Sequence, residues 1–407
     1  MEKNNNEPKL RFPGFTEPWE QRKFSDITYL AGEKNRDNIP YQSYSISNEK
    51  GFIPQDEQFE NGGTMKEADK SMYLIVQPNS FAYNPARINI GSIGYYDLPE
   101  NVIVSSLYEV FKTSDDIEDR FLWHWFKSDL FSKFIERYQE GGVRMYFYYN
   151  KLCMCSLNLP SIEEQRKIGE YFDKLDNLII LHQRKLNHLQ DKKKSLLQKM
   201  FPKNGEDFPE LRFPGFTAPW EQRKLKQLAN FAKGQGYSKN DLTDGGTPII
   251  LYGRLYTKYQ SAISEVDTFA IPQSGSIYST GEEVIVPASG ETAEDIARAS
   301  AIVKSGFLLG GDLNIIYPNK DISTIFLALS ISNGKQQKEL SKKAQGKSVV
   351  HLHNSDLEDV TISFPCREEQ ERIGSIFTHL DNLITLHQRK LNHLQEQKKA
   401  LLQQMFI

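Results

Sequence analysis

The sequence of 407 residues contains only three cysteines, no long hydrophobic run and almost no net charge. Three cysteines are too few for a disulfide framework or a tetrahedral metal site, which is typical of a protein of the reducing cytosol. No segment approaches the roughly 18 to 20 apolar residues of a membrane span, and the N-terminal MEKNNNEPKL has no apolar signal core. These absences predict a cytoplasmic protein with no membrane partner.

The formal net charge is −3 at pH 7, from 50 Lys and Arg against 53 Asp and Glu. A protein that grips nucleic acid over its whole surface usually has a clear excess of basic residues. Any contact with DNA or RNA is therefore expected from local patches.

Two pairs of near-identical segments divide the chain into tandem halves. LRFPGFTEPWEQRK at 10–23 returns at 211–224 with a single substitution. The longer segment 159–201 returns at 364–406, where 29 of 43 aligned positions are identical. Internal repetition on this scale is the main organising feature of the chain.

The regions between the repeats, 24–158 and 225–363, show no comparable similarity. The repeated segments are therefore expected to share one task and the variable regions to perform two different ones. Short apolar runs bounded by Gly, Pro, Asn and Asp predict strands in both regions, and the stretches 117–138 and 323–340 predict helices. Each variable region is thus predicted to be a mixed α+β domain.

The longer repeat predicts a long amphipathic helix. Ser161 and Glu164 form an S-x-x-E capping box at its start, and a helix from Glu163 to Met200 would be about 57 Å long. Apolar residues recur at alternating steps of four and three, which is a coiled-coil heptad. The two helices are predicted to pair antiparallel as a pseudo-twofold internal repeat, through a seam that contains Ile179, Leu186, Leu189, Leu196, Ile384, Leu391, Leu394 and Leu401.

Four polar residues, His182, Lys193, His387 and Lys398, interrupt this seam. A polar residue in a coiled-coil seam costs stability but fixes the alignment of the helices. We therefore expect these residues to set the register or to lie at the wet edge of the seam, and not to bind a metal or to catalyse a reaction.

No convincing nucleophile with its base, metal cluster or cofactor loop is found, so the chain is predicted not to be an enzyme. Ser341–Ser348 ends like a phosphate-binding loop but has Ser341 where the first glycine is required. Asn84, Pro85 and Ala86 only superficially resemble the N-P-P-aromatic motif of amino-methyltransferases.

Basic and aromatic residues gather around a glycine-containing loop before each long helix. Lys and Arg can neutralise phosphates, while Arg, Asn and Gln can read base edges. For any single residue, an ordinary surface or core position is nearly as good an interpretation. The paired placement nevertheless predicts DNA contacts from Arg137, Arg144, Tyr146, Tyr148, Asn150, Lys151, Lys338, Lys342, Lys343, Gln345, Lys347 and His351.

The repeated motifs resemble those of the specificity subunits of type I restriction-modification systems. The resemblance rests on P-W-E-x-x-K at Pro18–Lys23 and Pro219–Lys224, on P-x-x-x-E-Q-x-x-I at Pro160–Ile168 and Pro365–Ile373, and on the long helix after each. It implies two target recognition domains, each reading one half of a bipartite double-stranded DNA sequence, with the paired helices as a ruler over the unread spacer. It also implies two methyltransferase (modification) subunits docked on the helices and two restriction subunits.

On this resemblance the chain performs no chemistry and holds no cofactor, since S-adenosylmethionine, ATP and Mg would belong to the partner subunits. The implied parts are a first recognition domain at 1–158, a first conserved helix at 159–201, a second recognition domain at 202–363 and a second conserved helix at 364–407. The alternative is a tandem ligand-binding scaffold that does not bind DNA and assembles through its coiled coil. Salt-dependent DNA binding would separate the two, because phosphate contacts weaken steeply with salt.

Overall fold

A computed structural model describes residues 7–48, 51–58, 69–141, 145–203, 206–344 and 349–407. The chain forms two compact units, the first made of the residues up to 182 together with 390–407, and the second of residues 183–389. None of the described helices combines the length and the hydrophobicity that crossing a membrane requires.

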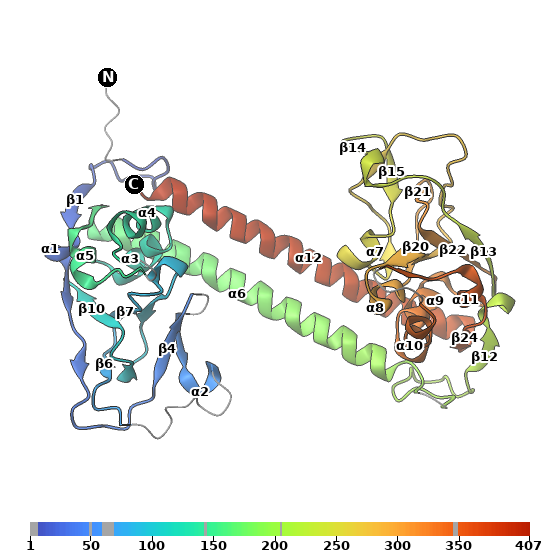
Figure 1. Ribbon diagram of the computed structural model, residues 1–407, viewed down its shortest axis with the longest axis horizontal. Helices are drawn as coiled ribbons and strands as arrows, with labels where there is room; N and C mark the ends of the chain where they lie inside the picture. Colours follow the sequence, from blue (N-terminus) through green and yellow to red (C-terminus); the bar gives the residue numbers. More distant parts are fainter. Residues whose placement is uncertain (1–6, 49–50, 59–68, 142–144, 204–205, 345–348) are drawn as a thin grey trace. The chain divides into compact units, whose positions relative to one another are not determined.

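The first unit contains a mixed domain centred on a four-stranded antiparallel sheet in the order β2-β10-β7-β8, with the sheet β3-β6-β9 and the hairpin β4-β5 beside it (Figure 1). Its strands are β1 (Glu20–Lys23), β2 (Thr28–Leu30), β3 (Glu33–Lys34), β4 (Tyr44–Ser47), β5 (Gly51–Pro54), β6 (Leu74–Val76), β7 (Ser80–Tyr83), β8 (Ile93–Tyr96), β9 (Val102–Val104), β10 (Glu109–Thr113) and β11 (Ser156–Leu159). Its short helices are α1 (Phe24–Ile27), α2 (Gln55–Gln58), η2 (Ile88–Ile90), α3 (Asp119–Phe126), α4 (Asp129–Tyr138) and α5 (Tyr149–Met154).

Aromatic side chains fill the core between this sheet and the helices. Phe81 and Phe111 are cross-strand partners whose stacked rings lie 5.2 Å apart, and Phe126 of α3 contacts both. Val110, the neighbour of Phe111 in β10, joins a second apolar cluster instead. Successive side chains of a strand point to opposite faces of the sheet, so β10 contributes to two apolar clusters.

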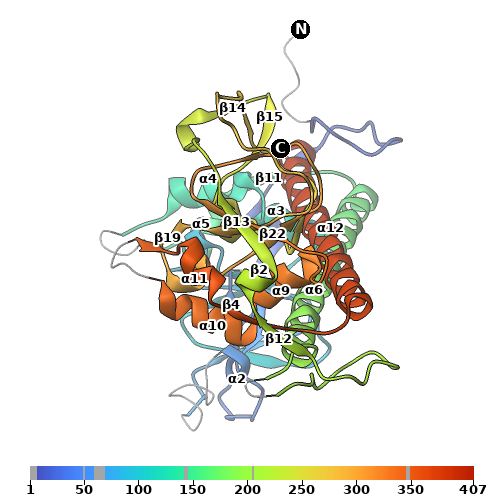
Figure 2. The same ribbon diagram turned by 90° about the vertical axis from the view of Figure 1, so that its right-hand side faces the viewer.

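The second unit contains a five-stranded sheet in the order β13-β22-β18-β20-β16 and a four-stranded sheet in the order β14-β17-β15-β21. Its strands are β12 (Glu221–Lys224), β13 (Ala229–Lys233), β14 (Leu242–Thr243), β15 (Thr247–Ile250), β16 (Ala262–Ile263), β17 (Phe269–Ala270), β18 (Val284–Pro287), β19 (Ser289–Gly290), β20 (Ser300–Ile302), β21 (Leu308–Leu309), β22 (Leu313–Pro318), β23 (Val350–His351) and β24 (Thr361–Phe364). Its short helices are η3 (Leu225–Gln227), η4 (Lys239–Asp241), α7 (Arg254–Thr257), α8 (Ala293–Ile296), α9 (Thr324–Ile331), α10 (Gly334–Lys343) and α11 (Asn354–Glu358). Figure 2 looks onto this unit, where α10 packs between α9 and α11.

The two domains share the centre of their sheets although their sequences differ. In the first, β10 lies between β2 and β7; in the second, β22 lies between β13 and β18, and all four pairings are antiparallel. Phe111 pairs with Leu30 of β2, and Ile316 pairs with Phe231 of β13. Leu30 and Phe231 each lie seven residues after the repeated segments 10–23 and 211–224, so Phe111 and Ile316 occupy the same place. The variable regions are therefore one framework with two different surfaces.

Each predicted helix of the variable regions is in fact two helices. The stretch 117–138 breaks after α3, where the Ser128 hydroxyl donates to the Trp125 carbonyl at 2.7 Å. A serine hydroxyl that bonds to a nearby carbonyl competes with the backbone hydrogen bonds that would continue the helix. The stretch 323–340 breaks between α9 and α10, where Gly334 has a φ of +59°, in the left-handed region that glycine tolerates.

The repeated segments form the joint between each domain and its helix. Strand β1 pairs antiparallel with β11, and β12 pairs in the same way with β24. Arg11 donates two hydrogen bonds of 2.8 Å to the buried Glu164, and Arg212 binds Glu369 at 2.7 and 2.8 Å. The capping-box prediction was thus half right: the Ser161 hydroxyl accepts from the Glu164 amide at 3.4 Å, but the Glu164 carboxylate binds Arg11.

The glutamine of each E-Q motif connects the long helix to the first short helix of its domain. The Gln165 side chain accepts from the Glu118 amide at 2.9 Å and donates to the carbonyls of Asp116 and Pro160. Gln370 makes the same three bonds, to Ser323, Asp321 and Pro365. These buried amides thus hold the same loops in both units.

Two long helices, α6 (Ile162–Lys199) and α12 (Arg367–Met405), complete the fold. In the first unit the start of α6 packs antiparallel against the end of α12, with Phe172 stacked on Phe406 at 5.8 Å and Lys398 paired with Asp176 (Figure 1). In the second unit the end of α6 packs in the same way against the start of α12. The predicted fold class, two mixed domains with two long antiparallel helices, is confirmed.

A glycine in each long helix allows the domain to approach closely, and this predicts unequal effects of substitution. A Cβ at Gly169 would lie 2.7 Å from the Glu118 carboxylate and 3.0 Å from the Phe121 amide, whereas at Gly374 the nearest atom is a methyl of Ile325 at 3.3 Å. We expect Gly169→Ala to lower the unfolding free energy by about 1–3 kcal/mol through overpacking. Gly374→Ala should be close to neutral, since alanine favours helix.

Thermal unfolding of the two alanine variants beside the unmodified chain measures this difference. Equal effects of both substitutions would show that the close contact at Gly169 does not control the packing of α3 on α6.

An ionic cluster also joins α3 to the helix pair of the first unit. The Nε2 atom of the fully buried His124 lies 2.9 Å from the Asp173 carboxylate, which also binds Arg120, and Lys127 lies 3.4 Å from Asp176. Burial lowers the pKa of His124 and lowers that of Lys127 to about 8. Although burial opposes it, hydrogen bonds from His124 and Arg120 hold the pKa of Asp173 below its ordinary value.

This cluster predicts that acid destabilises the first unit more than the second. A histidine whose folded pKa is lowered resists a proton that the unfolded chain accepts, so stability falls as the pH drops below about 6.5. Helix α9 takes the place of α3 in the second unit, because Gln370 bonds to the residue before α9 as Gln165 bonds to the residue before α3, and the position of His124 is there occupied by Leu329. Hydrogen exchange of buried amides in each unit, corrected for intrinsic rates, should show selective opening of the first unit at about pH 5.5. The His124→Leu variant should reduce that difference, and equal opening of both units would contradict the prediction.

Candidate nucleic-acid interface

The basic and aromatic residues predicted to contact DNA in the first domain lie in three places. Tyr146 and Tyr148 line a cleft, while Asn150 and Lys151 belong to α5. Arg137 is exposed in the last turn of α4, with its guanidinium 5.4 Å from the ring centre of Tyr138. Lys151 forms an ion pair with Glu140, which reduces the positive charge that it offers to a phosphate. Arg144 lies outside the described residues.

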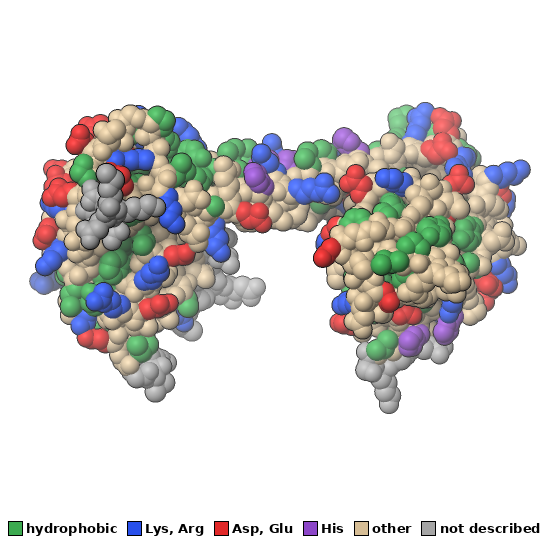
Figure 3. Space-filling view, turned by 90° about the horizontal axis from the view of Figure 1, so that it is seen from above, with side chains coloured by type: hydrophobic (Ala, Val, Ile, Leu, Met, Phe, Trp, Pro, Cys, Tyr) green, Lys and Arg blue, Asp and Glu red, His purple; other side chains and the backbone are tan. Residues whose placement is uncertain are grey.

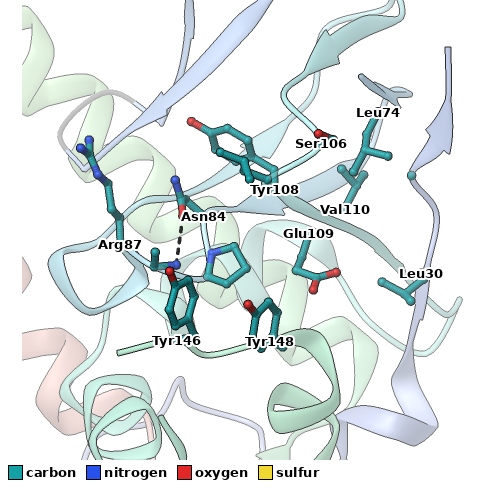
Figure 4. Close-up of a pocket in the computed structure, with 14 residues that line it drawn as sticks. Leu30, Leu74, Asn84, Arg87, Ser106, Tyr108, Glu109, Val110, Tyr146 and Tyr148 are labelled. Carbon is teal, nitrogen blue, oxygen red and sulfur yellow. Dashed lines mark hydrogen bonds between the residues drawn. The ribbon is translucent and has the colours of Figure 1, made fainter. Parts of the chain in front are cut away.

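The cleft is a concavity of the first domain with a volume of about 790 Å³ (Figure 4). The Tyr146 and Tyr148 rings lie almost parallel, 5.6 Å apart with an interplanar angle of 2°. Facing them are residues of β10 and of the turn before it. The lining comprises Leu30, Gly32, Leu74, Asn84, Pro85, Ala86, Arg87, Ser106, Leu107, Tyr108, Glu109, Val110, Tyr146 and Tyr148.

A tight turn after β7 holds the two tyrosines in place. The Asn84 side chain accepts from the Ala86 amide at 3.0 Å, and the Phe147 amide donates to the Pro85 carbonyl at 3.0 Å. Phe147, between the two tyrosines, is buried in the core. The Asn-Pro-Ala sequence thus forms a wall of the cleft.

Glu109 places a carboxylate in this largely apolar cleft. Burial raises its pKa, and a hydrogen bond from the Tyr149 amide opposes that rise. Among the described residues, no cation contributes to the shift of its pKa. Burial also raises the pKa of Tyr149 to about 12, and its hydroxyl is bonded to Thr28 at 2.9 Å. Glu109 therefore offers acceptor oxygens to a ligand in the cleft.

The basic residues of the second domain lie mainly on α10. Lys338 and Lys342 are exposed, whereas the Lys343 ammonium donates to the Asp356 carbonyl at 3.1 Å and lies 3.8 Å from Glu339. His351 is exposed in β23, opposite Ser289 of β19. Gln345 and Lys347 lie outside the described residues. DNA contact by any of these residues stays a prediction.

Basic residues do not form a single large patch on the visible face of either unit. In Figure 3, Lys and Arg side chains lie among Asp and Glu on both. This agrees with the net charge of −3 and limits phosphate contact on that face to small groups of residues.

The eight seam residues are all buried or half-buried. Ile179, Leu394 and Leu401 pack into the core of the first unit, and Leu189 and Leu196 pack against that of the second. Leu186 and Leu391 are each 3% exposed, and Ile384 is half-buried.

The seam lysines each have an acidic partner on the opposite helix. Lys398 pairs with Asp176 in the first unit, and Lys193 pairs with Asp381 in the second. Asp381 also accepts from the Ser261 amide at 3.1 Å. A buried ion pair across a helix seam favours one alignment, because slippage leaves a charge unpaired.

These features define a protein built from an internal duplication. Each of its two mixed domains is attached to a long helix by the same strand pairing and the same Arg–Glu ion pair, and the two long helices pair with each other. Residues 16–191 and 218–396 each match the family described as the type I restriction modification DNA specificity domain. The chain therefore belongs to the specificity subunits of type I restriction-modification systems.

Similar proteins include two from Methanocaldococcus jannaschii. The type I restriction enzyme MjaVIII specificity subunit is 22% identical over 385 residues, covering 92% of this chain and 84% of that protein. The putative type I restriction enzyme MjaX specificity subunit is 22% identical over 435 residues, covering 98% and 95%. The crystal structure of a type I restriction-modification S subunit from M. genitalium has a TM-score of 0.66 at 13% identity, covers 98% of this chain and 99% of that one, and supports the fold.

Proposed function

We propose that this chain selects the DNA sequence on which a type I restriction-modification complex acts, with one domain reading each half of a bipartite target. The proposal rests on one observation: two domains with different surfaces are joined to their long helices in the same way. The same Arg–Glu joint and the same sheet order recur in both units, while the residues on the surface differ. Reading two different sequences with one architecture requires this combination.

The long helices would dock the methyltransferase subunits. Apolar side chains remain exposed on α6 in the first unit, at Leu178, Ile180 and Leu181, and on α12 in the second, at Leu386. Leu181 and Leu386 are matching residues of the repeat, since they are 205 positions apart. A group of neighbouring exposed apolar residues, such as the three on α6, marks a protein contact more often than a single one does. On this proposal the chain performs no chemistry, and S-adenosylmethionine, ATP and Mg act in its partners.

Reconstitution with a methyltransferase partner, followed by genome-wide sequencing of methylated adenines, tests the proposal. A split motif with a fixed spacer is the expected result. A random or absent pattern would favour the alternative, a scaffold that does not bind DNA. Replacing 225–363 with the matching region of another family member should change one half of the motif only, and a change in both halves would contradict independent reading.

A further inference from the structure

The cleft of the first domain has the wrong shape to read an intact duplex. Base edges lie at the bottom of a groove about 8.5 Å deep, so a protein reads them with side chains that protrude. Glu109 and the Tyr146 and Tyr148 rings instead line a concavity of about 790 Å³. That volume lies in the range of sites for small organic molecules, and a single nucleotide is a ligand of this size.

The chemistry of the lining suits a base that has left its stack. Tyr148 is 46% exposed and lies almost parallel to Tyr146, so these rings offer a flat aromatic face. Stacking on an aromatic side chain stabilises an unpaired base whatever its sequence. Glu109 offers acceptors to the N–H groups of a Watson–Crick edge. Arg87, exposed at the rim, can neutralise the attached phosphate (Figure 4).

An exposed leucine stands at the rim of the same cleft. Leu107 lies in the tight turn between β9 and β10 and is 73% exposed. The turn is closed by the Tyr108 amide donating to the Ser105 carbonyl at 3.1 Å. Proteins that separate base steps often insert an apolar side chain of this kind. Leu107 can therefore occupy the space that a displaced base leaves.

We propose that the first domain draws one nucleotide of its half-site out of the duplex, placing the base against Tyr146 and Tyr148 beside Glu109, with Leu107 in the gap. This inference rests on the proposed function, since it requires the chain to bind duplex DNA. Guanine fits best, because two adjacent N–H groups of its Watson–Crick edge can face the carboxylate. Thymine fits worst, because its single N–H is flanked by carbonyl oxygens that the carboxylate repels.

The second domain has a different residue at the matching place of its sheet. By the shared strand order, the position of Glu109 in β10 corresponds to Asn314 in β22. Asn314 is fully buried, and its amide donates to the Leu352 carbonyl at 2.9 Å. Base extrusion is therefore assigned to the first half-site alone, and the second half-site serves as an internal control.

The test measures binding of the full chain, without methyltransferase subunits, to duplexes that carry its own target. At each position of both half-sites one base is kept and its partner is replaced to give a mismatch. Drawing a base out of a matched duplex costs free energy, because the base must be unpaired and unstacked. At a mismatch the base is already poorly paired, so this cost is smaller. The expected result is binding about tenfold tighter at one position of the first half-site, at a base other than thymine. Chemical probing with chloroacetaldehyde and permanganate should find the unpaired bases at the same position in the matched duplex.

Three variants connect this result to the cleft. Glu109→Gln, Tyr148→Ala and Leu107→Gly should each remove most of the tighter binding to the mismatched duplex. Tyr29→Ala changes an exposed tyrosine that does not line the cleft, and this variant should keep the tighter binding.

If every mismatch weakens binding while the split target is still recognised, base extrusion is wrong and the proposed function stands. If no split target is recognised, the proposed function itself fails. Binding of free GMP in the cleft with no tightened duplex position would also overturn base extrusion.

Discussion

The Arg212→Met variant is expected to lose about 3–5 kcal/mol of unfolding free energy in the second unit. Arg212 and Glu369 are joined by two hydrogen bonds, and their side chains are only 13% and 1% exposed. Removing the guanidinium leaves the Glu369 carboxylate buried without a counter-charge, which costs far more than the net value of the pair. Thermal unfolding of the full chain should show a low-temperature transition that the unmodified chain lacks.

Two further variants define the cause of this loss. Adding Glu369→Gln to Arg212→Met should recover part of the stability, because the buried group is then neutral. Arg372→Met breaks an exposed pair with Glu368 on the same helix and should cost less than about 1 kcal/mol. A loss of similar size for Arg212→Met and Arg372→Met would mean that the joint does not depend on the buried pair.

Phe406→Ala is expected to cost the first unit about 3–5 kcal/mol, although Phe406 is the penultimate residue. Its ring is 3% exposed and lies 5.8 Å from Phe172 of α6 and 5.3 Å from Phe121 of α3. Deleting a buried aromatic ring removes its contacts and leaves a cavity.

The matched variant of the other repeat is Phe201→Ala, since Phe201 lies near Phe326 and Phe377 in the second unit. Hydrogen exchange resolved by unit should show that Phe406→Ala opens the first unit and Phe201→Ala opens the second. An unchanged melting curve for Phe406→Ala would contradict the role of the end of α12 in the core of the first unit.

The long helices and their antiparallel pairing could be predicted from the sequence because their cause is local. A heptad of apolar residues requires a partner helix, and the second copy of the repeat supplies one. The breaks at Ser128 and Gly334 were missed, because one hydroxyl bond or one left-handed residue outweighs helical periodicity on either side. The partner of Glu164 was missed because Arg11 lies 153 residues away in the chain.

The cleft could be predicted only in part. Tyr146 and Tyr148 were singled out as an aromatic pair near a basic loop, but Arg87, Leu107 and Glu109 had no local signal. These residues come together because the strand order of the sheet brings the turn after β7 next to β10. A sheet order of this kind depends on long-range pairing, which a single sequence does not reveal.

The joints at the ends of the long helices also determine how the chain can be connected. The Leu10 amide donates to the Gln404 carbonyl at 3.0 Å in the first unit, and the Leu211 amide donates to the Lys199 carbonyl at 2.8 Å in the second. One of these joints is bridged by a covalent linker and the other lies between the two termini. A circular permutant that joins the termini with a linker like 200–210 and starts at the second repeated segment should therefore fold into the same two units, with their order along the chain exchanged.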